Sequence, residues 1–296
     1  MIFVIIHLHN SLHLSGGSKL QRIAMNKILC PIDFSEASKN GMEYAANLAK
    51  ALKAKLTLLY VRTSIWPEAI QLEKELSESN EAIQSRLAVF AVEVQKEFAI
   101  SCDYLIEQTT DTFEETVAAR SADYNLIVMG TNGADTFYQY VYGSNSFHVI
   151  ENSKRPVLIV PEGCAYRPFN MIVYAYDPET NPIFLIEQLK EIATPFRTEV
   201  KVLHISETKI SSDVKRKMEI LHDVVRARES KNISLSFDFT YSDEVAQALD
   251  AYIKIHAADM LALSFHNRSL MERIFRENTV KQISMVAVYP VFVFYH

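Results

Sequence analysis

The 296-residue chain contains few glycines and few cysteines. None of its seven glycines follows Gly163, so the C-terminal part of the chain lacks a glycine-rich loop of the kind that binds phosphate. Cys30, Cys102 and Cys164 form an odd, widely separated set. They provide neither a disulfide framework nor a Cys-x-x-Cys pair, and this pattern predicts a reducing, cytoplasmic compartment.

The chain also lacks an excess of positive charge and a long apolar run. It has 30 Lys and Arg residues against 36 Asp and Glu residues, which predicts no binding of nucleic acid or of a membrane surface. The apolar run at residues 2–6 is far shorter than the roughly 20 residues that span a bilayer, and no basic region of a signal peptide precedes it. We therefore expect residues 1–24 to be a disordered leader or an upstream extension from a misplaced start.

From residue 25 onward, short apolar runs alternate with amphipathic segments. The pattern predicts strands at 27–32, 56–61, 102–107, 125–130 and 157–160, separated by helices near 35–52, 68–98, 113–122 and 144–152. Ser35 is in the right place to cap the first of these helices. Such alternation is typical of a parallel sheet with helices on both faces.

The second half of the chain repeats the order of the first. Asp33 follows the first strand and Asp177 follows its counterpart 144 residues later, whereas Pro156 and Pro290, before the last strands, are 134 residues apart. We interpret the repeat as a tandem duplication.

The third strand of each copy, at 102–107 and 233–240, alternates apolar and polar residues, whereas the first and fourth are continuously apolar. A half-exposed strand belongs at the edge of a sheet. We therefore predict an α/β fold of two tandem doubly wound domains, each with a five-stranded parallel sheet of order 3-2-1-4-5 and helices on both faces. The domains are expected at 25–162 and 169–296.

Three glycines between the fourth strand and the next helix point to a ligand. The segment from Gly130 to Asn145 reads GTNGADTFYQYVYGSN. Gly130 ends a central strand at its carboxyl edge, where ligands of open α/β sheets bind. Gly133 allows close approach of the backbone, and Gly143 and Ser144 open a helix whose N–H groups favour an anion. Glycines also gather in loops without a ligand, but the flanking strand and helix make phosphate binding the better interpretation.

At these residues the sequence resembles the universal stress protein family, in two copies that cover nearly all of the chain from residue 25. The family motif G-x2-G-x9-G-[ST] is met from Gly130 to Ser144, and its P-x-D-x-S signature is met from Pro31 to Ser35. The resemblance implies an ATP site, with or without Mg²⁺. The residues that it implies for the nucleotide are Pro31, Ile32, Asp33, Val61, Met129, Gly130, Gly133, Gly143, Ser144 and Asn145.

The resemblance also implies roles for these residues. Those at the ends of the first two strands would face adenine and ribose, Met129 and Gly130 would line the base and sugar, and the remaining four would hold the phosphates. In the family, paired domains often meet through their last strands, which are residues 157–160 and 291–294 here.

The second copy departs from the motif. The residues that replace the three glycines and the serine are Ser264, Asn267, Glu277 and Asn278. Glu277 would repel a phosphate, so we expect one nucleotide per chain, in the N-terminal copy only.

These features favour an ATP-binding regulatory module of the stress response over an enzyme. The segment 130–145 contains no Lys or Arg and a single acid, Asp135, whereas phosphoryl transfer relies on cationic clamps. Asp33 lacks an acid–base partner in the motif, and we expect it to cap the following helix and touch ribose. We assign no catalytic residue and no metal ligand. A slow ATPase or phosphotransfer enzyme, a nucleotide-free interaction scaffold and a homodimer remain open alternatives.

Overall fold

The computed structural model describes residues 25–63, 79–131, 144–177, 183–206, 212–226, 232–265 and 289–295. The strands in these ranges are β1 (Lys27–Pro31), β2 (Lys55–Thr63), β3 (Cys102–Thr109), β4 (Leu126–Thr131), β5 (Val157–Pro161), β6 (Met171–Ala175), β7 (Thr198–Ser206), β8 (Ile233–Tyr241), β9 (Met260–Phe265) and β10 (Val291–Tyr295). They form a single ten-stranded sheet of order β3-β2-β1-β4-β5-β10-β9-β6-β7-β8. The predicted leader, residues 1–24, lies outside the described residues.

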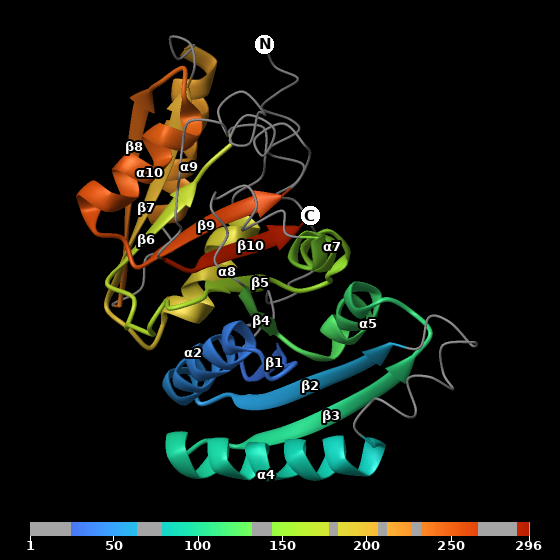
Figure 1. The fold of residues 1–296 in the computed structure, drawn as a ribbon. Coiled ribbons are helices and arrows are strands. Elements are labelled where there is room, and N and C mark those ends of the chain that lie inside the picture. The colour runs from blue at the N-terminus through green and yellow to red at the C-terminus, as the bar shows by residue number, and fades with distance from the viewer. Residues whose placement is uncertain are drawn as a thin grey trace, which may run out of the picture.

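Each half of this sheet is parallel, and the two halves join through an antiparallel seam. Figure 1 shows β5 beside β10 at the seam. Val157 of β5 is opposite Val293 of β10, and Ile159 is opposite Val291. Counted outward from the seam, both halves have the order 5-4-1-2-3. The predicted strand order and the predicted meeting of the two last strands are therefore confirmed.

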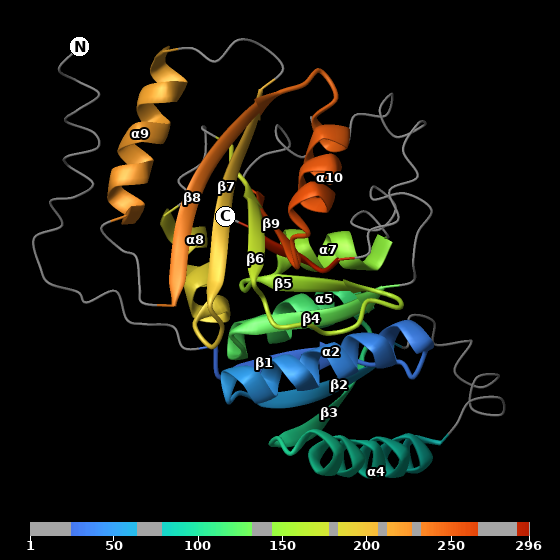
Figure 2. The ribbon, with the colours of Figure 1, turned by 90° about the vertical axis from the view of Figure 1, so that its left-hand side faces the viewer.

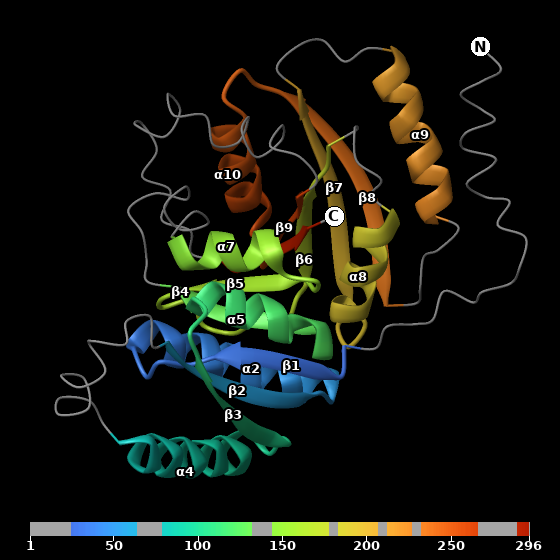
Figure 3. The same ribbon diagram turned by 90° about the vertical axis from the view of Figure 1, so that its right-hand side faces the viewer.

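Helices cover both faces of the sheet. They are α2 (Glu36–Leu52), α4 (Asn80–Phe98), α5 (Phe113–Arg120), α7 (Ser144–Asn152), α8 (Ile183–Ala193), α9 (Ser212–Arg226) and α10 (Val245–His256), with a short 3-10 turn, η1, at Ser121–Asp123. The helices α2, α4, α8 and α9 pack on one face, and α5, α7 and α10 pack on the other. Figures 2 and 3 show α9 and α10 on opposite sides of β7 and β8. Among the described helices none is long and apolar enough to cross a membrane.

Two matching side chains tie the ends of the strands together in the two halves. The Asn125 side chain accepts the backbone N–H of Lys27 at 3.0 Å, and the Asp259 side chain accepts the backbone N–H of Met171 at 3.0 Å. These residues are related by the 144- and 134-residue offsets of the repeat. A side-chain acceptor therefore occupies the same place at the start of β1 and of β6.

The structure also shows where the two offsets change. The connection between β2 and α4 spans residues 64–79, whereas its counterpart between β7 and α9 spans only 207–211. The helix that we predicted at 68–98 begins at Asn80. Ser79 caps it, because the hydroxyl oxygen of Ser79 accepts the backbone N–H of Ala82 at 3.2 Å. Residues 68–78 of that prediction lie outside the described residues.

Candidate functional site

The predicted site residues of the first half converge on one edge of the sheet. β1 lies between β2 and β4, and all three strands run in parallel, so their carboxyl ends meet at the same edge. Pro31 pairs with Leu59 of β2, two residues before Val61. The helix after β1 packs on one face and the helix before β4 on the other, which makes this edge the switch point of the first half, where such sheets bind ligands.

Asp33 follows β1 and is exposed at this edge, in a turn built around serine hydroxyls. Its Oδ1 accepts the backbone N–H of Ser35 at 2.9 Å and the Ser35 hydroxyl at 2.6 Å. The Ser35 hydroxyl oxygen in turn accepts the backbone N–H of Ser38 at 3.2 Å and caps α2, as the sequence predicts. Phe34, between them, has a φ of 65°, a conformation that is uncommon for a residue with a side chain. The carboxylate is therefore held in a defined place by the start of α2.

The same turn lowers the pKa of the Asp33 carboxyl. Local desolvation raises the pKa of its carboxyl, but hydrogen bonds from Ser35 and Ser38 outweigh this effect and lower the pKa below the ordinary value. At neutral pH the group is an anion that accepts hydrogen bonds and donates none.

Gly130 lies at the end of β4, where α2 comes into direct contact with the strand. A Cβ at Gly130 would lie 1.8 Å from the carbonyl oxygen of Ala37, and a Cβ at Gly41 would lie 2.3 Å from the Gly130 nitrogen. Both contacts are with backbone, which cannot swing away. The two glycines therefore let helix and strand approach, and this packing accounts for Gly130 without a ligand.

Two other predicted site residues are part of the core. Ile32 is buried in the cluster beneath α2 and α4, and Met129 is buried in the cluster on the opposite face. Val61 is partly buried and packs with the same cluster as Met129. Their apolar character follows from packing alone, and contact with an adenine ring would have to involve the part of each side chain nearest the edge.

Thr131 is the first residue after Gly130, and its hydroxyl oxygen is buried without a hydrogen-bond partner in the structure. Its carbonyl accepts the N–H of Glu162 at 2.9 Å, while Asn40 of α2 donates to the Pro161 carbonyl at 2.9 Å. The backbone around Thr131 is thus pinned between α2 and the end of β5. Buried hydroxyls almost always have a partner, and within the described residues Arg155 Nε and the Tyr289 hydroxyl share this exception with Thr131.

A sequence profile of the universal stress protein family matches residues 25–161. Residues 25–161 belong to the universal stress protein family. Universal stress protein MJ0531 of Methanocaldococcus jannaschii is 27% identical over 144 residues, which cover 45% of this chain and 81% of that protein. This relationship confirms the family that the glycine motif and the P-x-D-x-S signature indicate.

The fold of the whole chain is also found among universal stress proteins. The crystal structure of one from Archaeoglobus fulgidus superposes with a TM-score of 0.70 and 20% identity, covering 92% of this chain and 98% of that one. A functionally unknown protein of Pseudomonas aeruginosa superposes with a TM-score of 0.56 and 15% identity over 92% and 93% of the chains. Both similarities concern the fold alone, over nearly the whole length of the chain.

Four predicted residues of the universal stress protein motif are not described in full. Gly133 and Gly143 lie outside the described residues, and Ser144 and Asn145 open α7 without described side chains. The phosphate-binding role assigned to them stays a prediction.

The second half has a different edge. Ser264, at the position of Gly130, is buried, and its hydroxyl lies 3.3 Å from that of Tyr174. His204 is buried beside Tyr176, with Nδ1 3.1 Å from the Tyr176 carbonyl oxygen. Asn267, Glu277 and Asn278 lie outside the described residues. Within the part of the chain that is described, no cluster of three or more His, Cys, Asp or Glu residues is placed to hold a metal ion.

Sequence reasoning missed two residues near the carboxyl edge of the first half, Gly41 and Thr131. Gly41 is a lone glycine within a helical segment, a pattern that marks a close approach of backbone, and it could have been paired with Gly130. Thr131 carries no signal in the sequence, because its burial depends on α2 and β5 closing around it.

Ser35→Ala tests how the turn controls Asp33. We expect the pKa of the Asp33 carboxyl to rise toward its ordinary value, because two hydrogen bonds to the ionised form are weakened or lost, and stability to fall by about 1 kcal/mol with the cap of α2. An NMR pH titration and chemical denaturation measure the two effects. Ser79→Ala, which removes the cap of α4, is the control and should change stability without changing the Asp33 titration. An unchanged Asp33 pKa in Ser35→Ala would contradict this account.

Proposed function

We propose that the N-terminal domain, residues 25–162, binds one adenine nucleotide, ATP, and that the protein acts as a nucleotide-dependent regulatory module of the stress response. The observation that carries this proposal is the oriented carboxylate of Asp33 at the switch point where β1 and β4 end and the glycine motif begins.

The carboxylate suits the ribose end of a nucleotide. Both hydrogen bonds that Ser35 donates reach Oδ1, so Oδ2 is the oxygen through which Asp33 would accept ribose hydroxyls. An ionised acceptor forms hydrogen bonds worth roughly 1.5–3 kcal/mol each, about twice the value for neutral partners. The pKa of this carboxyl lies below its ordinary value, so Asp33 is such an acceptor at neutral pH.

The glycine motif suits the phosphate end. It begins at Gly130, continues through Thr131 and reaches the start of α7 at Ser144. A helix N-terminus offers free N–H groups and a partial positive charge to an anion. The motif contains no Lys or Arg, which supports binding of the nucleotide over its rapid turnover.

We infer that the second domain, proposed at 169–296, pairs with the first domain and does not bind nucleotide. Ser264 and Tyr174 form a polar contact where the first domain has Gly130 and Cys30. This buried pair occupies the strand end with side chains, and Glu277 stands at the sequence position that corresponds to Gly143.

Asp33→Ala provides the direct test. We expect ATP affinity, measured by calorimetric titration with and without Mg²⁺, to fall roughly ten- to a hundredfold, because one charge-assisted hydrogen bond or more to the ribose is lost. Asp177→Asn, at the equivalent position of the second half, is the matched control and should bind like the wild-type chain. Asparagine is used there because Asp177 is buried.

The proposal would fail if the wild-type chain bound no adenine nucleotide, or if Asp177→Asn lost affinity while Asp33→Ala kept it. Mass spectrometry of small molecules released from the purified, denatured protein checks independently which nucleotide is carried.

A further inference from the structure

Strand β8 is the last strand at one end of the ten-stranded sheet, and β7 is its neighbour. The carbonyl of Asn232 and the N–H of Ser242, just outside the two ends of β8, form hydrogen bonds with β7. Because the backbone groups of successive residues in a strand point to alternate sides, those of Leu235, Phe237 and Phe239 point away from β7. Figure 2 shows β8 with α9 on one side and α10 on the other. The outer edge of β8 therefore carries backbone donors and acceptors with which a further strand could pair.

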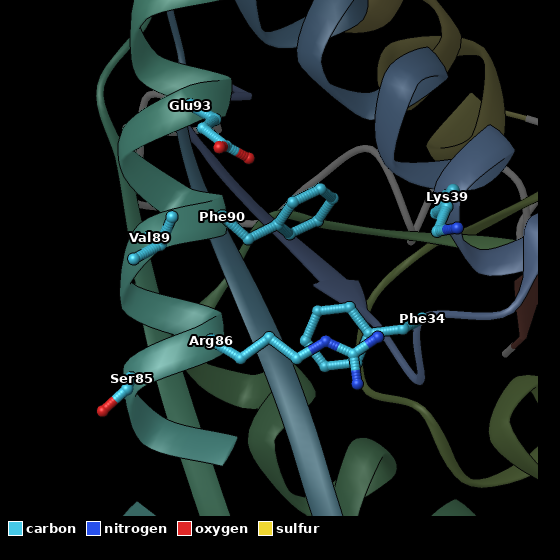
Figure 4. Close-up of a pocket in the computed structure, with 7 residues that line it drawn as sticks. All are labelled: Phe34, Lys39, Ser85, Arg86, Val89, Phe90 and Glu93. Carbon is cyan, nitrogen blue, oxygen red and sulfur yellow. The ribbon is translucent and has the colours of Figure 1, made fainter. Parts of the chain in front are cut away.

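The carboxyl end of β8 also exposes two aromatic side chains. Phe239 and Tyr241 are 54% and 50% exposed, and their rings are 6.3 Å apart. In the first half, the position of Phe239 is taken by Ile106 of β3, which packs in the same core cluster as Phe34 and Phe90. Figure 4 shows the rings of these two phenylalanines, 5.7 Å apart, between α4 and the turn that begins α2. The first half thus covers at this position what β8 leaves exposed.

The two edge strands of the sheet also differ in charge. The edge strand β3 carries Asp103 and Glu107, and both form ion pairs with basic side chains. At the same positions β8 carries Ser236 and Thr240. Charged side chains on an edge strand oppose its pairing with another chain. Of the two edges, β8 is therefore the better suited to accept a strand.

The polarity of β8 is symmetric about its middle residue, Phe237. Its sequence ISLSFDFTY alternates apolar and polar residues, and it begins and ends with an apolar one. If two copies of β8 paired antiparallel about Phe237, Leu235 would face the partner's Phe239. In the same pair, Ser236 would face the partner's Asp238. Because Asp238 is the one charged residue of β8, no like charges of the two strands would stand opposite each other.

We propose that β8 pairs with β8 of a second copy of the chain, in antiparallel orientation about a two-fold axis at Phe237. The outward backbone groups of Leu235 and Phe239 would then form hydrogen bonds with the partner strand, and the exposed Phe239 side chain would pack on the partner's Leu235. A two-fold interface requires a surface that complements itself, and the symmetric pattern of β8 provides one. A strand from an unrelated protein would not require this symmetry.

The chain already contains a pairing of this kind. At the seam, β5 and β10 are antiparallel neighbours, although the strands within each half are parallel. Because both seam strands are paired, the edges that remain among the described strands are β3 and β8. The β8 edge belongs to the second half and is separate from the proposed nucleotide site, so the pairing does not depend on nucleotide binding.

Phe239→Lys tests the proposed surface. We expect the wild-type full-length chain to form a reversible dimer in sedimentation equilibrium, and Phe239→Lys to weaken that dimer at least tenfold, because a charged side chain would face the partner's Leu235 twice in each dimer. The control is Ile255→Lys, the same charge introduced at an apolar side chain of α10 that is 79% exposed. It should dimerise like the wild type. Thermal unfolding of both variants shows whether either change disturbs the fold.

Disulfide formation between two variants tests the register. Ser234 faces the partner's Thr240 in the proposed pair, so a one-to-one mixture of Ser234→Cys and Thr240→Cys should form a disulfide-linked dimer under a mild oxidant. Cα atoms of directly opposite residues lie about 4.5–5.5 Å apart, within the range of a disulfide. Each variant alone should stay unlinked, because its two new cysteines would lie about 20 Å apart along the paired strands. The natural cysteines are buried, and the oxidised wild type is the control for them.

A wild-type chain that stays monomeric at several hundred micromolar would overturn the proposal. So would equal weakening of the dimer by Ile255→Lys, or a dimer in which the two cysteine variants fail to cross-link with each other. If Phe239→Lys fails to fold, the mixture of cysteine variants decides the question.

Discussion

Gly130→Ala is expected to lower the free energy of unfolding by about 3 kcal/mol or more. The added Cβ would lie 1.8 Å from the Ala37 carbonyl oxygen, about half the distance of a favourable contact. The obstructing atom belongs to the backbone of α2, so relief requires the helix to move away from β4. That movement would weaken the packing of α2 against the core as well as the site. Chemical denaturation of the purified variant measures the loss.

Two further alanine variants serve as comparisons for Gly130→Ala. Gly41→Ala probes the same contact from the other side, since its Cβ would lie 2.3 Å from the Gly130 nitrogen, and it should be comparably destabilising. Gly163 has a φ of 76° but no atom near a new Cβ. Gly163→Ala should therefore cost only about 1–2 kcal/mol of backbone strain. If Gly130→Ala lowered the free energy of unfolding no more than Gly163→Ala does, the inferred close contact between α2 and β4 would be wrong.

Gly143→Val is expected to weaken ATP binding at least roughly a hundredfold. The position belongs to the G-x2-G-x9-G-[ST] motif and immediately precedes α7. A β-branched side chain there would occupy the space of a phosphate and separate it from the N–H groups at the start of the helix. The loss of two hydrogen bonds to a charged group, at about 1.5–3 kcal/mol each, is enough for this effect.

The matched control for this variant is Glu277→Ala, which removes the acid at the equivalent position of the second half. It should leave both affinity and stoichiometry unchanged, because we expect no nucleotide there. Calorimetric titration of the wild type and both variants measures affinity and the number of sites together. Two equivalent sites per chain, or full affinity in Gly143→Val, would contradict the placement of the nucleotide.

The sequence predicts the sheet well because its signals are local and periodic. The continuous apolar runs of β1 and β4 and the alternation in β3 and β8 distinguish central strands from edge strands, and the structure has that order. Ser35 is recognisable as a cap because its hydroxyl acts on the N–H of Ser38, three residues away. Features of this kind depend on neighbours in the chain, and one sequence displays them.

The site was harder to predict because its residues serve the fold as well. The motif predicts a ligand role for Gly130, and the Ala37 carbonyl, which is remote in sequence, also accounts for its lack of a side chain. Ile32 was assigned to the nucleotide and is also a member of the core beneath α2. Whether a residue such as Gly130 or Ile32 is explained by packing or by a ligand depends on distances between elements, and the periodicity of the sequence does not encode these distances.

The two halves that meet at the antiparallel seam between β5 and β10 belong to one covalent chain. Without the linker they would be two separate subunits. Their pairing is therefore independent of protein concentration, because each half is held near the other by the linker between β5 and β6. In a dimer of identical subunits, every substitution appears on both sides of the axis at once. Here each half changes separately, so Ser264 can fill one strand end while Gly130 keeps the other bare. Covalent joining thus lets the strand end of one half change while that of the other half stays as it is.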